Sequence, residues 1–176
     1  MNDNSDTTKF LILRAQKRAI SDREAWNLLE SAEAIYGFLG THGVKDEGNM
    51  PYVVPMNFAA DSEARAIYLH TTIDADSKRN RAIAEDSHVT FVVVGPDASI
   101  SNDGSGLACK FSMSFTSAMA FGEIEKIESP AEKARILNFF MKQKTVGHTV
   151  SGVTEAQTAL TTIYVLNVEH VSGSSK

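Results

Sequence analysis

PYVVPMNFAADSEARAIYLHTT, residues 51–72, is the stretch of sequence that decides the fold. It holds two runs of apolar, branched and aromatic residues, 52–58 and 66–71, separated by the polar turn Asp61-Ser62-Glu63. Two such runs around a short polar turn are typical of antiparallel strands joined in a hairpin. Pro55 has no amide hydrogen to give to a strand ladder, so we expect it at an edge or a bulge. The segment therefore predicts a β-hairpin.

Further strand patterns lie on both sides of this hairpin. They cover residues 35–41, 88–94, 111–127 and 161–168. Residues 88–94 are almost uniformly β-branched, which predicts a strand that is buried on both faces. Residues 95–106 are rich in Gly, Ser, Asp and Asn, so a long surface loop is expected there.

Three short helices are expected at the connections between strands. Ser21-Asp22-Arg23-Glu24 is a capping box before an apolar helical pattern. Ser129-Pro130-Ala131-Glu132 is a second one, with proline at the first helical position. The basic segment 77–83 suggests a third helix. About six antiparallel strands with three short helices predict a mainly β (α+β) protein whose sheet closes into a barrel, because closure removes exposed strand edges.

Length, charge and cysteine content restrict the class of protein. The 176 residues suit one domain, 1–176, with flexible ends at 1–10 and 172–176. A net charge of -5 with scattered cations argues against a nucleic-acid partner, and no apolar run is long enough to span a membrane. The polar N-terminus lacks a secretory signal, so we expect a cytoplasmic protein. Cys109 is the single cysteine, and no metal site is predicted.

The order of these elements resembles the pyridoxamine 5'-phosphate oxidase-like superfamily of FMN-binding split barrels, and within it the 5-nitroimidazole-resistance (Nim) branch. Residues 14–29, 36–41, 51–71 and 114–122 carry the likeness. The third segment is the most specific, because its paired prolines and the strand-ending His70 occur together at the family's spacing. The resemblance implies an antiparallel six-stranded split β-barrel that forms a homodimer, with FMN in a groove between the two barrels.

The resemblance also implies which residues contact FMN. These residues come from one strand near the flavin ring, from the end of the next strand, from the basic segment at the phosphate, and from a later strand. They are Tyr52, Val53, Val54, Pro55, Met56, Asn57, His70, Thr71, Thr72, Ser77, Lys78, Arg79 and Ser117.

The basic segment departs from the family pattern. Between His70 and the first cation there is no glycine and there is one extra residue. Counting forward from His70 favours Lys78 as the phosphate ligand, whereas counting back from Ile83 favours Arg79, so both remain candidates. A phosphate needs cations and free amides, which the start of a helix supplies. Acidic residues at positions 74 and 76 would weaken that binding.

Two classes of function remain open. The first is an FMN-dependent oxidoreductase that takes electrons from NAD(P)H or another carrier and reduces a small planar acceptor such as a nitroaromatic, with His70 as the catalytic residue that orients or protonates it. The alternative is a non-catalytic flavin- or haem-binding protein for storage, sensing or delivery, which the altered phosphate segment favours. Pyridoxamine 5'-phosphate oxidase activity ranks lower, because the Arg-rich segments of that enzyme are missing.

Overall fold

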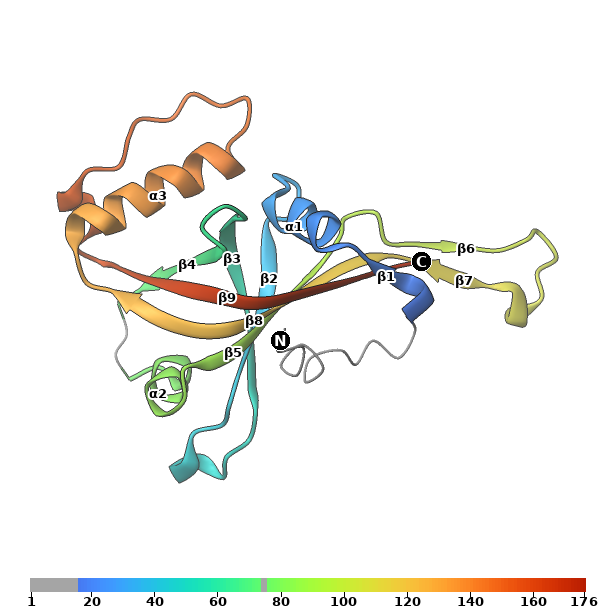
Figure 1. Ribbon diagram of the computed structural model, residues 1–176, viewed down its shortest axis with the longest axis horizontal. Helices are drawn as coiled ribbons and strands as arrows, with labels where there is room; N and C mark the ends of the chain where they lie inside the picture. The colour runs from blue at the N-terminus through green and yellow to red at the C-terminus, as the bar shows by residue number, and fades with distance from the viewer. Residues whose placement is uncertain (1–15, 74–75) are drawn as a thin grey trace, which may run out of the picture.

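The computed structural model describes residues 16–73 and 76–176, and Figure 1 shows their arrangement. The strands are β1 (Ala19–Ile20), β2 (Tyr36–Thr41), β3 (Tyr52–Asp61), β4 (Ala66–Thr72), β5 (His88–Val94), β6 (Ser99–Ser101), β7 (Ser112–Ser114), β8 (Thr116–Ile127) and β9 (Thr161–Ser175). The α-helices are α1 (Asp22–Glu30), α2 (Lys78–Glu85) and α3 (Pro130–Lys144). Short 3-10 turns are η2 (Gln16–Arg18), η3 (Lys45–Glu47), η4 (Ala108–Lys110) and η5 (Glu155–Thr158).

Six strands close into an antiparallel barrel. Their order is β9-β4-β3-β2-β5-β8, and β8 pairs with β9 to close the ring. The short strand β1 pairs with the C-terminal end of β9 as an extra strand. This topology confirms the six-stranded antiparallel barrel expected from the sequence.

The barrel interior is filled by large apolar side chains of alternate strand residues. The rings of Phe58 and Phe91 meet edge to face with centroids 5.0 Å apart, and Leu39 and Leu166 beside them are fully buried. Trp26 of α1 joins the same core, so this helix closes part of the barrel. Removal of such side chains from water is the main force that holds the barrel together.

Two helices are fixed by specific contacts. The capping box at Ser21 is confirmed, because Glu24 accepts a hydrogen bond of 2.8 Å from the Ser21 amide. Helix α3 packs on the outside of β4, where the rings of Tyr68 and Phe139 lie 5.5 Å apart. At its end, Lys144 donates from Nζ to two backbone carbonyls that follow α1, at 2.7 and 2.9 Å.

Two sequence expectations about strands are wrong. Strand β5 is not buried on both faces: Phe91 and Val93 are buried, whereas Val94 is 50% exposed. A barrel of one chain covers only the inner face of each strand, so a uniformly apolar sequence leaves apolar side chains outside. The expected strand 111–127 is divided at Phe115 into β7 and β8, and β7 pairs with β6 inside the segment expected to be a loop.

The two chain ends differ in outcome. Residues 1–10 lie outside the described residues. At the other end, where the sequence predicts a flexible tail at 172–176, residues up to Ser175 continue β9 and pair with β8 and β1. Backbone pairing on both sides therefore holds a polar sequence that has no apolar pattern of its own. Among the described helices, none is both long and apolar enough to cross a membrane.

Candidate functional site

Strand β3 presents a free edge where the sequence placed the cofactor. Its first half pairs only with β2, because pairing with β4 begins at Phe58. This confirms the edge position of Pro55. Side chains alternate along the strand: Tyr52, Val54 and Met56 are partly or fully buried, and Val53, Pro55 and Asn57 are exposed. Asn57 donates from its side-chain amide to the Ile35 carbonyl at 3.0 Å.

The end of β4 and the start of α2 meet through Arg79. Its guanidinium donates to the hydroxyl of Thr71 at 3.1 Å and to the amide oxygen of Asn80 at 3.2 Å. Ser77 caps α2 by accepting a hydrogen bond from the Asn80 amide. The neighbouring Thr72 is exposed at the last position of β4. Arg79 thus connects two of the segments that the sequence predicted to lie together.

Lys78 points toward β3 instead. Its ammonium nitrogen lies 5.8 Å from the ring centroid of Tyr52 and 3.5 Å from a carboxylate oxygen of Glu47. Lys78 and Arg79 therefore stand beside different parts of the predicted site, one at the start of β3 and the other at the end of β4.

Glu47 is the acidic neighbour of this cluster. It comes from the turn between β2 and β3, and it forms ion pairs with both Lys78 and Arg81. The hydrogen bond with Arg81 is the main reason that the pKa of Glu47 is lowered. Sequence analysis missed this residue, because only the folded hairpin brings position 47 beside position 78. Of the acidic residues that the sequence suggested, Asp74 lies outside the described residues and Asp76 is exposed.

His70 lies on the outer side of β4, beneath α3. Its ring meets that of Phe140 edge to face, with centroids 4.9 Å apart. Burial lowers the pKa of His70, so the neutral imidazole is favoured at neutral pH. A neutral imidazole offers one donor and one acceptor nitrogen.

Ser117 is far from His70 within one chain. His70 pairs with Ile163, and Ile163 pairs with Ile127 at the end of β8. Ser117 is ten residues away along that strand, which is roughly 33 Å at the rise of a β-strand. The structure therefore does not bring these two predicted site residues together in one protomer.

A cavity of about 490 Å³ opens on the outer face of the barrel next to β3. Its lining includes Val53, Thr90, Phe121, His42, His88 and Glu169. Val53 is the predicted site residue that reaches it.

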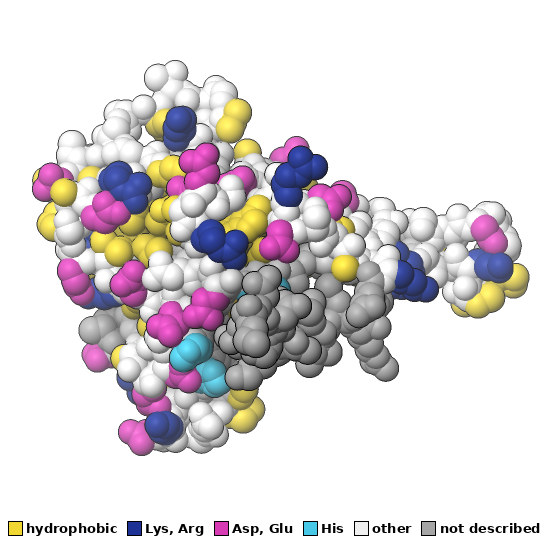
Figure 2. Space-filling view, in the orientation of Figure 1, with side chains coloured by type: hydrophobic (Ala, Val, Ile, Leu, Met, Phe, Trp, Pro, Cys, Tyr) yellow, Lys and Arg dark blue, Asp and Glu magenta, His cyan; other side chains and the backbone are white. Residues whose placement is uncertain are grey.

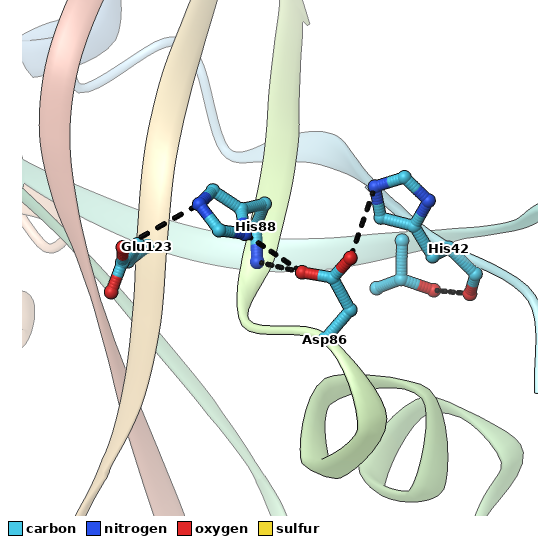
Figure 3. Close-up of polar contacts among 5 residues, drawn as sticks. His42, Asp86, His88 and Glu123 are labelled. Atoms are coloured by element: carbon cyan, nitrogen blue, oxygen red, sulfur yellow. Dashed lines mark hydrogen bonds and ion pairs between the residues drawn. The ribbon is translucent and has the colours of Figure 1, made fainter.

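Histidine and acidic side chains gather beside this cavity (Figures 2 and 3). Asp86 Oδ1 accepts a hydrogen bond from the backbone amide of His88 at 2.9 Å and lies 2.8 Å from the Nδ1 atom of the same histidine. The other carboxylate oxygen, Oδ2, lies 3.6 Å from His42 Nε2. Glu123 is 3.5 Å from His88 Nε2. The hydrogen bond to Asp86 raises the pKa of His88, and the bonds from His88 lower the pKa of Asp86. In residues 16–73 and 76–176, no group of three such side chains could hold a metal ion.

The outer face of strands β2, β3 and β5 carries exposed apolar side chains. Tyr36 and Val53 are 54% and 61% exposed, and Phe38 and Val94 are 39% and 50% exposed. Strands β3, β2 and β5 are neighbours, since Phe38 pairs with β3 on one side and with β5 on the other. These four side chains, which we call the outer apolar face, lie on adjacent strands without cover from any described segment.

Comparisons with known proteins agree with the resemblance seen in the sequence. A sequence model described as pyridoxamine 5'-phosphate oxidase matches residues 21–175. No curated protein matches the chain.

Solved structures share the fold at low sequence identity. A candidate 5-nitroimidazole antibiotic resistance protein from Bacteroides thetaiotaomicron VPI-5482 has a TM-score of 0.70 and 22% identity, over 89% of this chain and 86% of that one. The flavocytochrome Anf3 from Azotobacter vinelandii has a TM-score of 0.70 and 20% identity, over 93% and 71%. The FAD and heme binding protein from Mycobacterium smegmatis has a TM-score of 0.66 and 20% identity, over 90% and 73%. At these identities the likeness concerns the fold alone.

Proposed function

The chain belongs to the pyridoxamine 5'-phosphate oxidase family, and from this premise we propose that it is an FMN-dependent oxidoreductase acting on a small planar acceptor such as a nitroaromatic. The observation that carries the proposal is the contact of Arg79 with Thr71, which joins a cation at a helix start to the end of the strand beside β3. Solved structures with this barrel include proteins named for FAD or as a flavocytochrome, which supports a flavin as the ligand.

The residues at the start of α2 fit a phosphate. Arg79 and Lys78 supply two cationic side chains, and their backbone amides lie in the first helical turn, ahead of the Asn80 amide that donates to Ser77. The free edge of β3 at residues 52–57, which pairs only with β2, offers backbone groups beside a planar ring. Glu47 opposes phosphate binding by holding Lys78.

A homodimer is part of this proposal. Ser117 lies roughly 33 Å along β8 from Ile127, which is two strands away from His70, so a ligand that touches both Ser117 and His70 requires Ser117 from a second copy. The outer apolar face supports the same arrangement, because exposed apolar side chains on adjacent strands favour a covering partner.

Bound flavin would supply the redox chemistry, taking electrons from NAD(P)H and passing them to the acceptor. The role of the chain is to bind and orient. We assign to His70 the positioning of the acceptor through a hydrogen bond from its neutral imidazole, since burial disfavours the charged form. His70→Gln should then lower turnover about tenfold or more and leave the Kd for FMN within about twofold.

The test is reconstitution of the full chain with FMN, followed by fluorescence titration and an NAD(P)H oxidation assay with nitroaromatic acceptors. Arg79→Ala should weaken FMN binding by about 10- to 100-fold, the equivalent of one charge-assisted hydrogen bond. Arg23→Ala, an exposed arginine on α1, is the matched control and should bind FMN like the wild type. Failure of the wild type to bind FMN would overturn the proposal.

The second candidate is a non-catalytic flavin- or haem-binding protein. Glu47 favours it, because a carboxylate paired with two cations beside the phosphate site lowers the affinity for the ligand and suits reversible delivery. Tight or reversible FMN binding with no acceptor reduction under any donor tested would support this candidate over the enzyme.

A further inference from the structure

Strands β6 and β7 form a two-stranded arm that projects away from the barrel between β5 and β8 (Figure 1). The arm has two chemically different sides, because side chains alternate along a strand. Ile100 pairs with Met113 on one side. The other side is entirely serine: Ser99 pairs with Ser114, and Ser101 pairs with Ser112.

The apolar side of the arm has no cover among the described residues. Ile100 and Met113 are 73% and 63% exposed, and Leu107 and Phe111 toward the tip are 57% and 49% exposed. Figure 2 shows apolar side chains at the far end of the arm, away from the body of the molecule. An isolated two-stranded hairpin is only marginally stable in water. The exposed apolar side chains therefore indicate that contact with a partner stabilises the arm.

The charge of the arm narrows the choice of partner. Its only ionisable side chains between residues 99 and 114 that carry charge at neutral pH are Asp103 and Lys110, whose charged atoms lie 3.9 Å apart and offset each other. A nearly neutral arm has no electrostatic preference for nucleic acid or for a strongly charged peptide. Of these kinds of partner, an apolar protein surface is the one that complements the arm.

The same chain provides such a surface in its outer apolar face. The exposed parts of those four side chains and of the four on the arm amount to at most roughly 700–1,100 Å² per protomer, if each residue is given the 150–250 Å² of an aromatic side chain, which is an upper figure for the aliphatic ones. A stable interface of standard size buries about 800 Å² per partner. One surface that carries both complementary parts can close a two-fold dimer, because each copy gives and receives the same contact.

We propose that the β6–β7 arm clasps a second copy of this chain, with Ile100, Met113, Leu107 and Phe111 packed on the partner's outer apolar face. This rests on the homodimer within the proposed function and adds the segment that holds it together. The serine side of the arm then faces solvent.

The experiment is sedimentation equilibrium of the full chain with and without FMN. The double variant Ile100→Ser and Met113→Ser should raise the dimer Kd at least tenfold. The control Ser101→Thr and Ser112→Thr alters the opposite side of the arm at the same strand positions and should leave the dimer Kd within about twofold. Far-UV circular dichroism of each variant checks that the barrel is folded.

A third variant separates failure of the arm from failure of the dimer. Phe38→Ser changes the outer apolar face and should weaken the dimer whether or not the arm takes part. The clasp is overturned, and the dimer retained, if the wild type dimerises, Phe38→Ser raises the dimer Kd and the arm variant leaves the dimer Kd unchanged. A wild type that is monomeric at all concentrations would overturn both.

Alkylation of Cys109 gives an independent readout. This single cysteine is exposed near the arm tip. Its alkylation by a maleimide should be slower in the wild-type dimer than in the Ile100→Ser and Met113→Ser variant, and equal rates at dimer-forming concentrations would contradict the clasp.

Discussion

Glu47 limits how tightly the cations of α2 can hold a phosphate. Its carboxylate lies 3.5 Å from the Lys78 ammonium and is also paired with Arg81. A phosphate oxygen bound by Lys78 at hydrogen-bond distance would lie within roughly 6 Å of that carboxylate. At the high effective dielectric of a surface site this repulsion is partly screened, and its removal corresponds to a Kd that is lower by about 5- to 30-fold.

We therefore expect Glu47→Gln to tighten FMN binding by about 5- to 30-fold in fluorescence titrations at low salt. The gain should largely disappear at 1 M salt, where the Debye length is about 3 Å. Glu132→Gln is the matched control, because Glu132 also pairs with an arginine but lies on α3. Unchanged or weaker FMN binding by Glu47→Gln at low salt would refute the placement of the phosphate beside Lys78.

Three further outcomes are expected. Because its pKa is raised, His88 stabilises the fold fully below pH 6.5, its ordinary pKa, and this contribution is lost as the pH rises through the raised pKa. Because its pKa is lowered, Asp86 stabilises the fold fully above pH 3.8, its ordinary pKa, and this contribution is lost as the pH falls through the lowered pKa. His88→Ala should therefore lower the unfolding free energy between pH 3.8 and 6.5 in urea titrations and weaken its decline on either side of that window, and an unchanged pH profile would contradict the pairing. Gly122→Ala should lower stability by about 1–3 kcal/mol or more in thermal unfolding, because a Cβ there would overlap a carbonyl oxygen of β9; a wild-type Tm would rule this out. Lys144→Met should lose about 1–3 kcal/mol through the loss of two hydrogen bonds from a charged donor, with the exposed Lys142→Met as a near-neutral control in the same urea assay; equal losses would show that the carbonyl contacts of Lys144 do not matter.

The sequence predicts those parts of the fold that depend on local signals. The hairpin of β3 and β4 follows from two apolar runs around a polar turn, and the start of α1 follows from the Ser21 and Glu24 capping box. The start of α2 is different in kind, since Arg79 and Thr71 are eight residues apart and meet only because a helix follows the strand. The resemblance to a family supplied that part of the site.

The remaining features depend on contacts between distant segments. Small residues Ala118 and Ala120 line the inside of β8, so its larger side chains Met119 and Phe121 point outward, against the usual expectation that large apolar residues fill a core. The sequence does not predict the arm, because the segment between positions 95 and 106 has the composition of a loop. Glu47 can be identified as part of the candidate site only from the folded structure, where the hairpin places it beside Lys78.

The most direct test of the flavin site compares FMN with riboflavin, which lacks the phosphate. The full chain should bind FMN at least tenfold more tightly than riboflavin, and the double variant Lys78→Ala and Arg79→Ala should bind the two equally, because the phosphate contacts are gone. Equal binding of both flavins by the wild type, or binding of neither, would contradict a phosphate site at the start of α2.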